Sequence, residues 1–236
     1  MAEEPDKKDR LAGLVDSILS RVSTNPLLPT AFPLRLTPKT TLDPNEDDGT
    51  NAPYLTNKKR LISLIDPKVK VILELLVKGE ANWPLTLWGP PGTGKTSAAL
   101  ALLDRVASNQ RREWKGRAIF GRGYYTLSDF CKRANDAKYN PIKETYAGFV
   151  EKIECAALLV IDEVDRMETV SDTRHETLTD LLDRREGMPL VLLSNSSPDQ
   201  LGQMYGARVP SRLANGVIYK MDGPDRRISK GGNNGR

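Results

Sequence analysis

The 236-residue sequence is poor in the residues that build disulfide frameworks, zinc sites and membrane spans. It holds two cysteines and one histidine, with no pair at metal-ligand spacing, so we expect Cys131 and Cys155 to be reduced thiols in or near the core. No apolar run approaches the roughly 18 residues of a spanning helix, and residues 1–10 lack a hydrophobic signal segment. We therefore expect a cytoplasmic protein with no membrane partner.

Residues 84–96 carry the most specific motif of the chain. A strand-like apolar run at 85–88 leads into GPPGTGKT, and an Ala/Leu-rich helical pattern follows. This is the phosphate-binding loop G-x-x-x-x-G-K-[ST], in which backbone N–H groups surround a polyphosphate at the positive end of a helix. Its lysine reaches the β- and γ-phosphates and its threonine holds Mg²⁺. We predict that ATP is held by Gly89, Pro90, Pro91, Gly92, Thr93, Gly94, Lys95, Thr96 and Ser97.

The sequence divides into four predicted segments. Residues 1–23 include an amphipathic helix at 10–22, whose apolar stripe either folds back on its own domain or docks on a partner protein. Residues 24–57 hold six of the sixteen prolines and an acidic run, which is typical of a flexible linker. Residues 58–222 form the predicted core, and residues 223–236 a flexible basic tail.

The core alternates apolar strands with helical patterns. A helix is predicted from the Asp66-Pro67 start to the Gly79 stop, because Asp is a good N-cap and Pro a good first residue. Alternation of this kind predicts an α/β fold with a five-stranded, mostly parallel sheet covered on both faces. The expected strands are 85–88, one within 118–126, 157–161, 190–193 and 217–221, and the expected helices are 95–108, 128–138, 143–154, 174–186 and a piece around 211–213.

Polar residues end two of these strands. In parallel α/β sheets the ligand lies at the carboxyl ends of the strands, where Asp162, Glu163 and Asn195 all fall. We predict that Asp162 holds Mg²⁺ together with Thr96, and that Glu163 orients or deprotonates the attacking water. Asn195 is expected to bind that water and the γ-phosphate. These roles imply hydrolysis.

Two further features have both a structural and a functional interpretation. Six basic residues against one acid occupy positions 105–122, which describes either a solvated surface or a DNA-facing one. Tyr124 and Tyr125 are expected to pack within a strand rather than to stack on a base.

GPPGTGKT, the LLVIDE and LLSNSS strand ends and VPSRL, in this order and spacing, resemble an AAA+ ATPase over roughly residues 60–222. Within that superfamily the LLDRR helix end and the RVPSRL segment look like DnaC-type helicase loaders and IstB-like ATPases. The resemblance implies a P-loop NTPase fold, Asn195 as sensor 1, and Arg212 as an arginine finger inserted into a neighbouring subunit, with Arg208 as the alternative. Only 24 residues follow Arg212, so the helical lid is expected to be absent or minimal. Arg226 and Arg227 are candidates to replace its sensor 2 arginine.

The resemblance implies an ATP hydrolase that forms an ATP-dependent homo-oligomer. It implies single-stranded DNA and a client protein, a replicative helicase, as partners. Two alternatives stay open at this stage. An IstB-like ATPase would share the nucleotide chemistry but regulate a transposase, and a nucleotide-gated adaptor would bind ATP with negligible turnover.

Overall fold

The computed structural model describes residues 66–106, 112–114, 117–119, 121–166 and 172–225. The predicted helix at 10–22, the linker at 24–57 and the pair Arg226 and Arg227 lie outside the described residues. The proposed segment boundaries therefore stay predictions.

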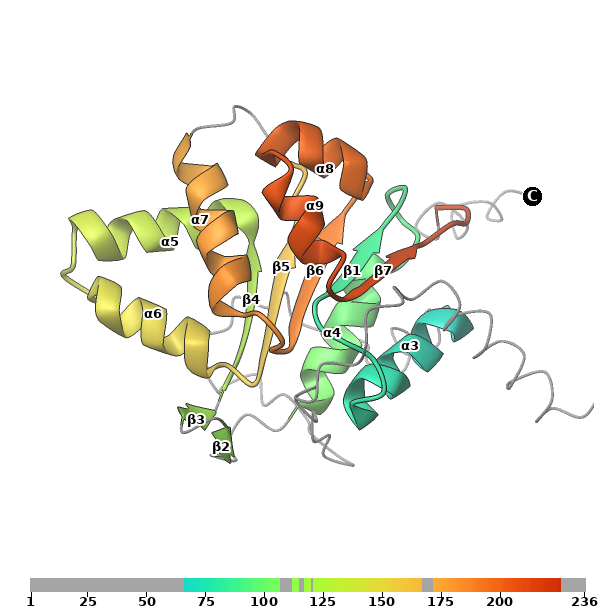
Figure 1. The fold of residues 1–236 in the computed structure, drawn as a ribbon, viewed down its shortest axis with the longest axis horizontal. Helices are drawn as coiled ribbons and strands as arrows, with labels where there is room; N and C mark the ends of the chain where they lie inside the picture. The colour runs from blue at the N-terminus through green and yellow to red at the C-terminus, as the bar shows by residue number, and fades with distance from the viewer. Residues whose placement is uncertain (1–65, 107–111, 115–116, 120, 167–171, 226–236) are drawn as a thin grey trace, which may run out of the picture.

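Seven helices and seven strands occur in the described residues (Figure 1). The helices are α3 (Pro67–Lys78), α4 (Lys95–Arg105), α5 (Leu127–Tyr139), α6 (Tyr146–Cys155), α7 (Asp172–Arg184), α8 (Pro198–Tyr205) and α9 (Arg208–Leu213). The strands are β1 (Leu85–Trp88), β2 (Arg112–Trp114), β3 (Arg117–Ile119), β4 (Arg122–Thr126), β5 (Leu158–Asp162), β6 (Leu190–Ser194) and β7 (Val217–Lys220). No helix among the described residues is long and apolar enough to cross a membrane.

Five strands form the central sheet in the order β4-β5-β6-β1-β7. All four strand pairs are parallel, as the alternation of strands and helices predicted. The strand β1, which leads into the phosphate-binding loop, lies between β6 and β7. The short strands β2 and β3 form a separate antiparallel pair that the sequence reading did not predict.

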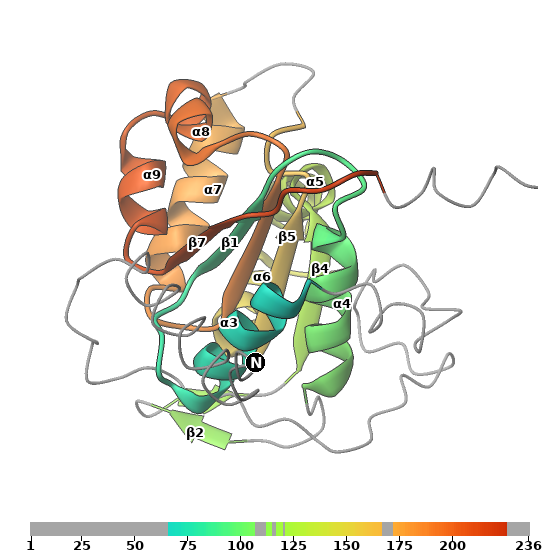
Figure 2. The same cartoon turned by 90° about the vertical axis from the view of Figure 1, so that its right-hand side faces the viewer.

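Helices cover both faces of the sheet, as the turned view in Figure 2 shows. Successive strand residues contribute to two different cores, because side chains alternate between the faces of a strand. Leu158 and Val160 belong to the core that includes α3 and α4, whereas Leu159 and Ile161 belong to the core that includes α5 to α9. Burial on both faces explains why the strands are almost continuously apolar.

Local signals explain the helix ends that the sequence predicted well. The Asp66 carboxylate accepts a hydrogen bond from the Lys68 N–H at 2.8 Å, and Gly79 ends α3 with a left-handed φ of 77°. The helix α8 was not predicted, although Ser197 and Gln200 form a capping box at its start. The helix α4 ends at Arg105, three residues before the predicted Ser108.

Arg122 corrects one interpretation of the basic segment at 105–122. The residue is only 5% exposed, and its guanidinium donates hydrogen bonds to the carbonyl oxygens of Leu103 and Val106 at 3.1 and 3.0 Å. These carbonyls lie at the carboxyl end of α4, where a cation is favoured by the helix dipole. Arg122 therefore stabilises the end of α4 and does not face DNA.

Candidate functional site

The phosphate-binding loop connects β1 to α4 in the predicted way. Gly92 and Gly94 have φ values of 77° and 101°, in the left-handed region that glycine adopts without strain. Gly94 is the N-cap of α4 and provides no side-chain hydrogen bond, so no side-chain cap satisfies the first N–H groups of the helix. The Thr93 hydroxyl donates to the Pro90 carbonyl oxygen at 3.0 Å and holds the loop in shape. Such a loop fits a phosphate group.

Lys95 links the loop to the end of a neighbouring strand. Its ammonium donates to the carbonyl oxygens of Gly89 and Pro90 at 2.6 and 2.8 Å, and to the Asn195 side-chain oxygen at 2.9 Å. The lysine is 8% exposed. A second bond fixes Asn195, whose backbone N–H donates to the Asp165 carboxylate at 2.9 Å. The structure thus brings together Lys95 and Asn195, which are 100 residues apart in the sequence.

Asp162 lies directly beside the loop threonine. The Thr96 hydroxyl donates to Oδ2 of Asp162 at 2.9 Å, and the Glu163 N–H donates to Oδ1 at 2.7 Å. The carboxylate is 8% exposed. Tyr124 also donates to Oδ2, at 2.6 Å, a contact that the sequence reading missed. The signal that would have found it is the parallel register of β4 and β5, which pairs Tyr124 with Val160, two residues before Asp162.

These oxygens fit a magnesium ion. Mg²⁺ prefers oxygen ligands and uses one or two protein groups together with phosphate oxygens and water. The Thr96 hydroxyl and the Asp162 carboxylate supply a pair of adjacent oxygens next to the phosphate-binding loop. Among the described residues, no group of three or more His, Cys, Asp or Glu side chains forms a separate metal site. Any metal at this loop would therefore depend on the nucleotide for further ligands.

Glu163 is close to the site in the chain, but its carboxylate is engaged elsewhere. Both carboxylate oxygens accept from the same Arg166 nitrogen at 3.0 Å. Glu163 has a φ of 55°, the one positive φ of a non-glycine residue among the described residues. Such a backbone conformation costs on the order of 1 kcal/mol and is often found at functional sites. The structure thus pairs this carboxylate with Arg166, whereas Lys95 donates to Asn195.

Arg212 lies near the starting ends of the strands, whereas the phosphate-binding loop lies at their carboxyl ends. It lines a small cavity with Pro84 and Leu190, which lie at the starting ends of β1 and β6. Its guanidinium donates to the Asp183 carboxylate at 2.8 Å, and Arg208 donates to the other oxygen of the same carboxylate at 2.6 Å. Neither arginine contacts the phosphate-binding loop of its own chain through these bonds. In this arrangement Arg212 and Arg208 pair with Asp183 of their own chain rather than with the phosphate-binding loop.

The remaining predicted residues vary in exposure, and the segment after β7 covers part of the loop. Pro90 and Pro91 are exposed, Gly89 is buried and Ser97 is half-buried at the start of α4. A Cβ atom added to Gly92 would lie 1.9 Å from a carboxylate oxygen of Asp225. An acidic side chain thus packs directly against the loop that is expected to hold phosphates.

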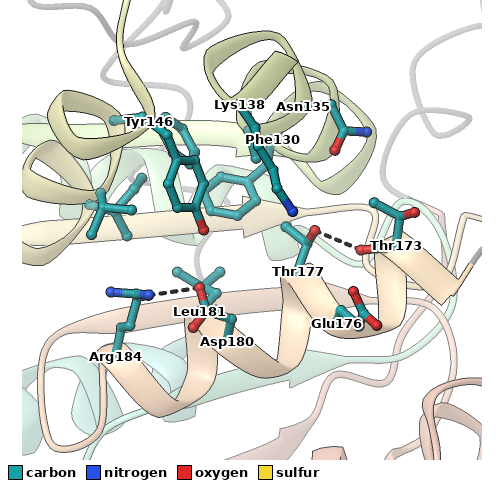
Figure 3. Close-up of a pocket in the computed structure, with 14 residues that line it drawn as sticks. Phe130, Asn135, Lys138, Tyr146, Thr173, Glu176, Thr177, Asp180, Leu181 and Arg184 are labelled. Carbon is teal, nitrogen blue, oxygen red and sulfur yellow. Dashed lines mark hydrogen bonds and ion pairs between the residues drawn. The ribbon is translucent and has the colours of Figure 1, made fainter.

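A pocket of about 220 Å³ lies away from this loop, between α5, α6 and α7 (Figure 3). Phe130, Phe149 and Leu181 are among its apolar lining residues, while Lys138, Asp180 and other polar side chains surround them. None of the residues predicted for the nucleotide site lines it. The two cysteines are buried thiols, as expected, and neither forms a disulfide.

The loop, the strand ends and the sheet order together define a P-loop ATPase. The chain belongs to the ATPase family associated with various cellular activities (AAA), whose model matches residues 85–214, more than half of the chain. Family membership confirms the predicted fold and the prediction of an ATP hydrolase. As an AAA ATPase the chain is a nucleotide-binding protein.

Similar proteins include one that is named for DNA replication. The chain is 30% identical to the replication factor C large subunit of Archaeoglobus fulgidus over 142 residues, which cover 53% of this chain and 26% of that protein. The chain therefore spans about a quarter of the length of this curated relative. Its structure is similar to that of DnaI, with 18% identity, coverage of 71% and 95% of the two chains, and a TM-score of 0.53.

A second similar structure is the replication initiator DnaA bound to AMPPCP and single-stranded DNA. It shares 18% identity, covers 78% of this chain and 51% of its own, and gives a TM-score of 0.53. At these identities the two structural similarities show a common fold alone.

Proposed function

We propose that this AAA ATPase is a Mg²⁺-dependent ATPase of DNA replication that assembles with itself in the presence of ATP. In this proposal it engages single-stranded DNA and loads or remodels a client, of which a replicative helicase is the first candidate. The observation that carries the nucleotide chemistry is the convergence of Lys95, Thr96, Asp162 and Asn195 at one edge of the sheet. The similarity to the replication factor C large subunit supports the proposed role in replication.

Each residue has one role in the proposed mechanism. The N–H groups of the phosphate-binding loop and Lys95 bind the phosphates, and Asn195 responds to the γ-phosphate because it already shares a hydrogen bond with Lys95. Thr96 and Asp162 would hold Mg²⁺, which neutralises charge on the phosphates when bound. Glu163 orients or deprotonates the attacking water after leaving Arg166.

The proposal assigns Arg212 to the nucleotide site of a neighbouring subunit. In the proposed oligomer Arg212 leaves its ion pair with Asp183 and approaches the phosphates of the neighbouring subunit. An arginine finger supplied by another chain is worth about 10³ to 10⁵ in rate in related phosphoryl-transfer systems. The monomer is then a poor ATPase, and turnover depends on protein concentration.

ATP hydrolysis with and without single-stranded DNA tests this proposal. We expect the wild type to hydrolyse ATP with a rate that rises with protein concentration and responds to DNA. Lys95→Ala should not bind nucleotide, whereas Glu163→Gln should bind ATP and assemble without turnover. Normal hydrolysis by Glu163→Gln would show that the base is another group.

A nucleotide-gated adaptor with negligible turnover is the second candidate function. The ion pair between Glu163 and Arg166 favours it, because this pair keeps the proposed base away from a water beside the phosphates. ATP-dependent assembly of the wild type without measurable hydrolysis, at any protein or DNA concentration, would identify the adaptor.

The client separates the helicase-loader proposal from an IstB-like ATPase that regulates a transposase. The Glu163→Gln protein with ATP can be mixed with a purified replicative helicase or with a transposase, in parallel with a protein lacking residues 1–23. We expect capture of the helicase and its loss on deletion. Capture that is unchanged by the deletion would rule out docking through residues 1–23.

A further inference from the structure

Tyr124 contacts the candidate nucleotide site, although it is not among the site residues that the sequence predicts. It is a residue of β4 and is 6% exposed. Its ring packs in the core that includes α4, the helix that carries Thr96. Burial excludes stacking on a nucleic-acid base. A phenylalanine would fill the same volume, so the contact that requires explanation is the one made by the hydroxyl.

The Tyr124 hydroxyl donates to Oδ2 of Asp162 at 2.6 Å. This is a short hydrogen bond between two buried side chains.

Three donors together fix the orientation of the Asp162 carboxylate. Oδ2 accepts from Tyr124 at 2.6 Å and from Thr96 at 2.9 Å, and Oδ1 accepts from the Glu163 N–H at 2.7 Å. A carboxylate has about four lone-pair positions, so most of its acceptor capacity is committed. Without the tyrosine, Oδ2 keeps only the Thr96 hydroxyl, and this hydroxyl is also the proposed metal ligand.

We propose that Tyr124 is a positioning residue that holds the Asp162 carboxylate toward Thr96, in the orientation that a nucleotide-bound divalent cation requires. The inference rests on the proposed function, in which Thr96 and Asp162 hold that cation. Hydrogen-bond partners of metal ligands typically change metal affinity or activity by about 10- to 100-fold when they are removed. Tyr124 would act through Asp162 and would not touch the nucleotide.

Tyr124→Phe tests this role, and Tyr125→Phe is the matched control. Tyr125 is the next residue of the same strand, is equally buried, and its hydroxyl accepts from Arg133 at 2.7 Å in the other core. Each variant therefore loses one buried hydroxyl, but only one of them loses a contact to Asp162. Thermal melting of the nucleotide-free chains verifies that both variants fold.

The readout is metal binding, separate from turnover. ADP affinity of the full chain is measured with Mg²⁺ and with EDTA, and Mn²⁺ binding in the presence of ADP is followed by electron paramagnetic resonance. We expect Tyr124→Phe to weaken Mn²⁺ binding about 10-fold and to leave ADP affinity in EDTA unchanged. Tyr125→Phe should match the wild type in both measurements.

Two results would overturn the inference while leaving the proposed function intact. One is wild-type Mn²⁺ affinity in the folded Tyr124→Phe protein, and the other is an equal loss of ADP affinity with and without metal, which would indicate a packing role. Failure of the proposed function looks different. In that case Mg²⁺ or Mn²⁺ would not affect ADP binding by the wild-type protein.

Discussion

Replacing the buried arginine of β4 separates a structural role from a DNA-binding one. Arg122→Met keeps the apolar part of the side chain and removes the guanidinium, which donates to two carbonyl oxygens at the end of α4. A hydrogen bond that involves a charged group contributes about 1.5–3 kcal/mol, and removal of the buried charge offsets part of the loss. We expect the free energy of unfolding to fall by about 2–4 kcal/mol.

This loss is large enough to measure by thermal melting. At about 2–4 °C per kcal/mol for a domain of this size, the melting temperature should fall by roughly 4–16 °C. Single-stranded DNA affinity, measured by fluorescence anisotropy below the transition, should stay at the wild-type value. Lys115→Met removes one positive charge from the same basic segment and controls for a general effect of charge on DNA affinity. An unchanged melting temperature together with weaker DNA binding by Arg122→Met would refute the structural assignment.

Three other perturbations test separate parts of the account. Arg166→Ala releases Glu163 from a largely exposed ion pair worth at most about 1 kcal/mol, so kcat for ATP hydrolysis should rise by no more than about 5-fold. A 100-fold fall in kcat would show that Arg166 itself is needed for hydrolysis. Asp225→Asn removes a negative charge beside the phosphate-binding loop and should tighten ATP binding by up to about 5-fold. Adenosine affinity should not change, and the control variant Asp222→Asn should not change ATP affinity. Weaker ATP binding by Asp225→Asn would show that Asp225 is a nucleotide ligand. Burial raises the pKa of the Cys131 thiol from 9.0 to about 11, so iodoacetamide at pH 8 should not modify this thiol in the folded chain. Between pH 9 and 11 the thiol ionises in the unfolded chain only, so the free energy of unfolding should fall as the pH rises through this range.

The nucleotide site could be predicted from the sequence because its parts are local and periodic. Except for Arg212, each predicted residue lies in or next to GPPGTGKT or at the end of an apolar strand, and a parallel sheet brings the carboxyl ends of its strands together. The sequence thus predicted that Asn195 lies at the same end of the sheet as the phosphate-binding loop, and its hydrogen bond with Lys95 is found only in the structure. Such a prediction needs only parallel strands, which the alternation of strands and helices implies.

The contacts that it missed depend on register and on side-chain direction. Tyr124 reaches Asp162 because of the pairing between β4 and β5, which strand periodicity alone does not specify. A run of basic residues suggests a surface, so the burial of Arg122 was not expected. The Glu163 carboxylate turns to Arg166, three residues later, through a backbone conformation that is rare outside glycine.

The central claim is that an active site is completed by the next copy of the chain, and subunit mixing tests it most directly. Arg212→Ala and Glu163→Gln should each be inactive alone. Equal mixing in ATP creates about one interface in four with an intact Glu163 on one side and an intact Arg212 on the other. We expect hydrolysis to return at these interfaces. Complete inactivity of the mixture, with both proteins binding ATP and assembling together, would contradict it.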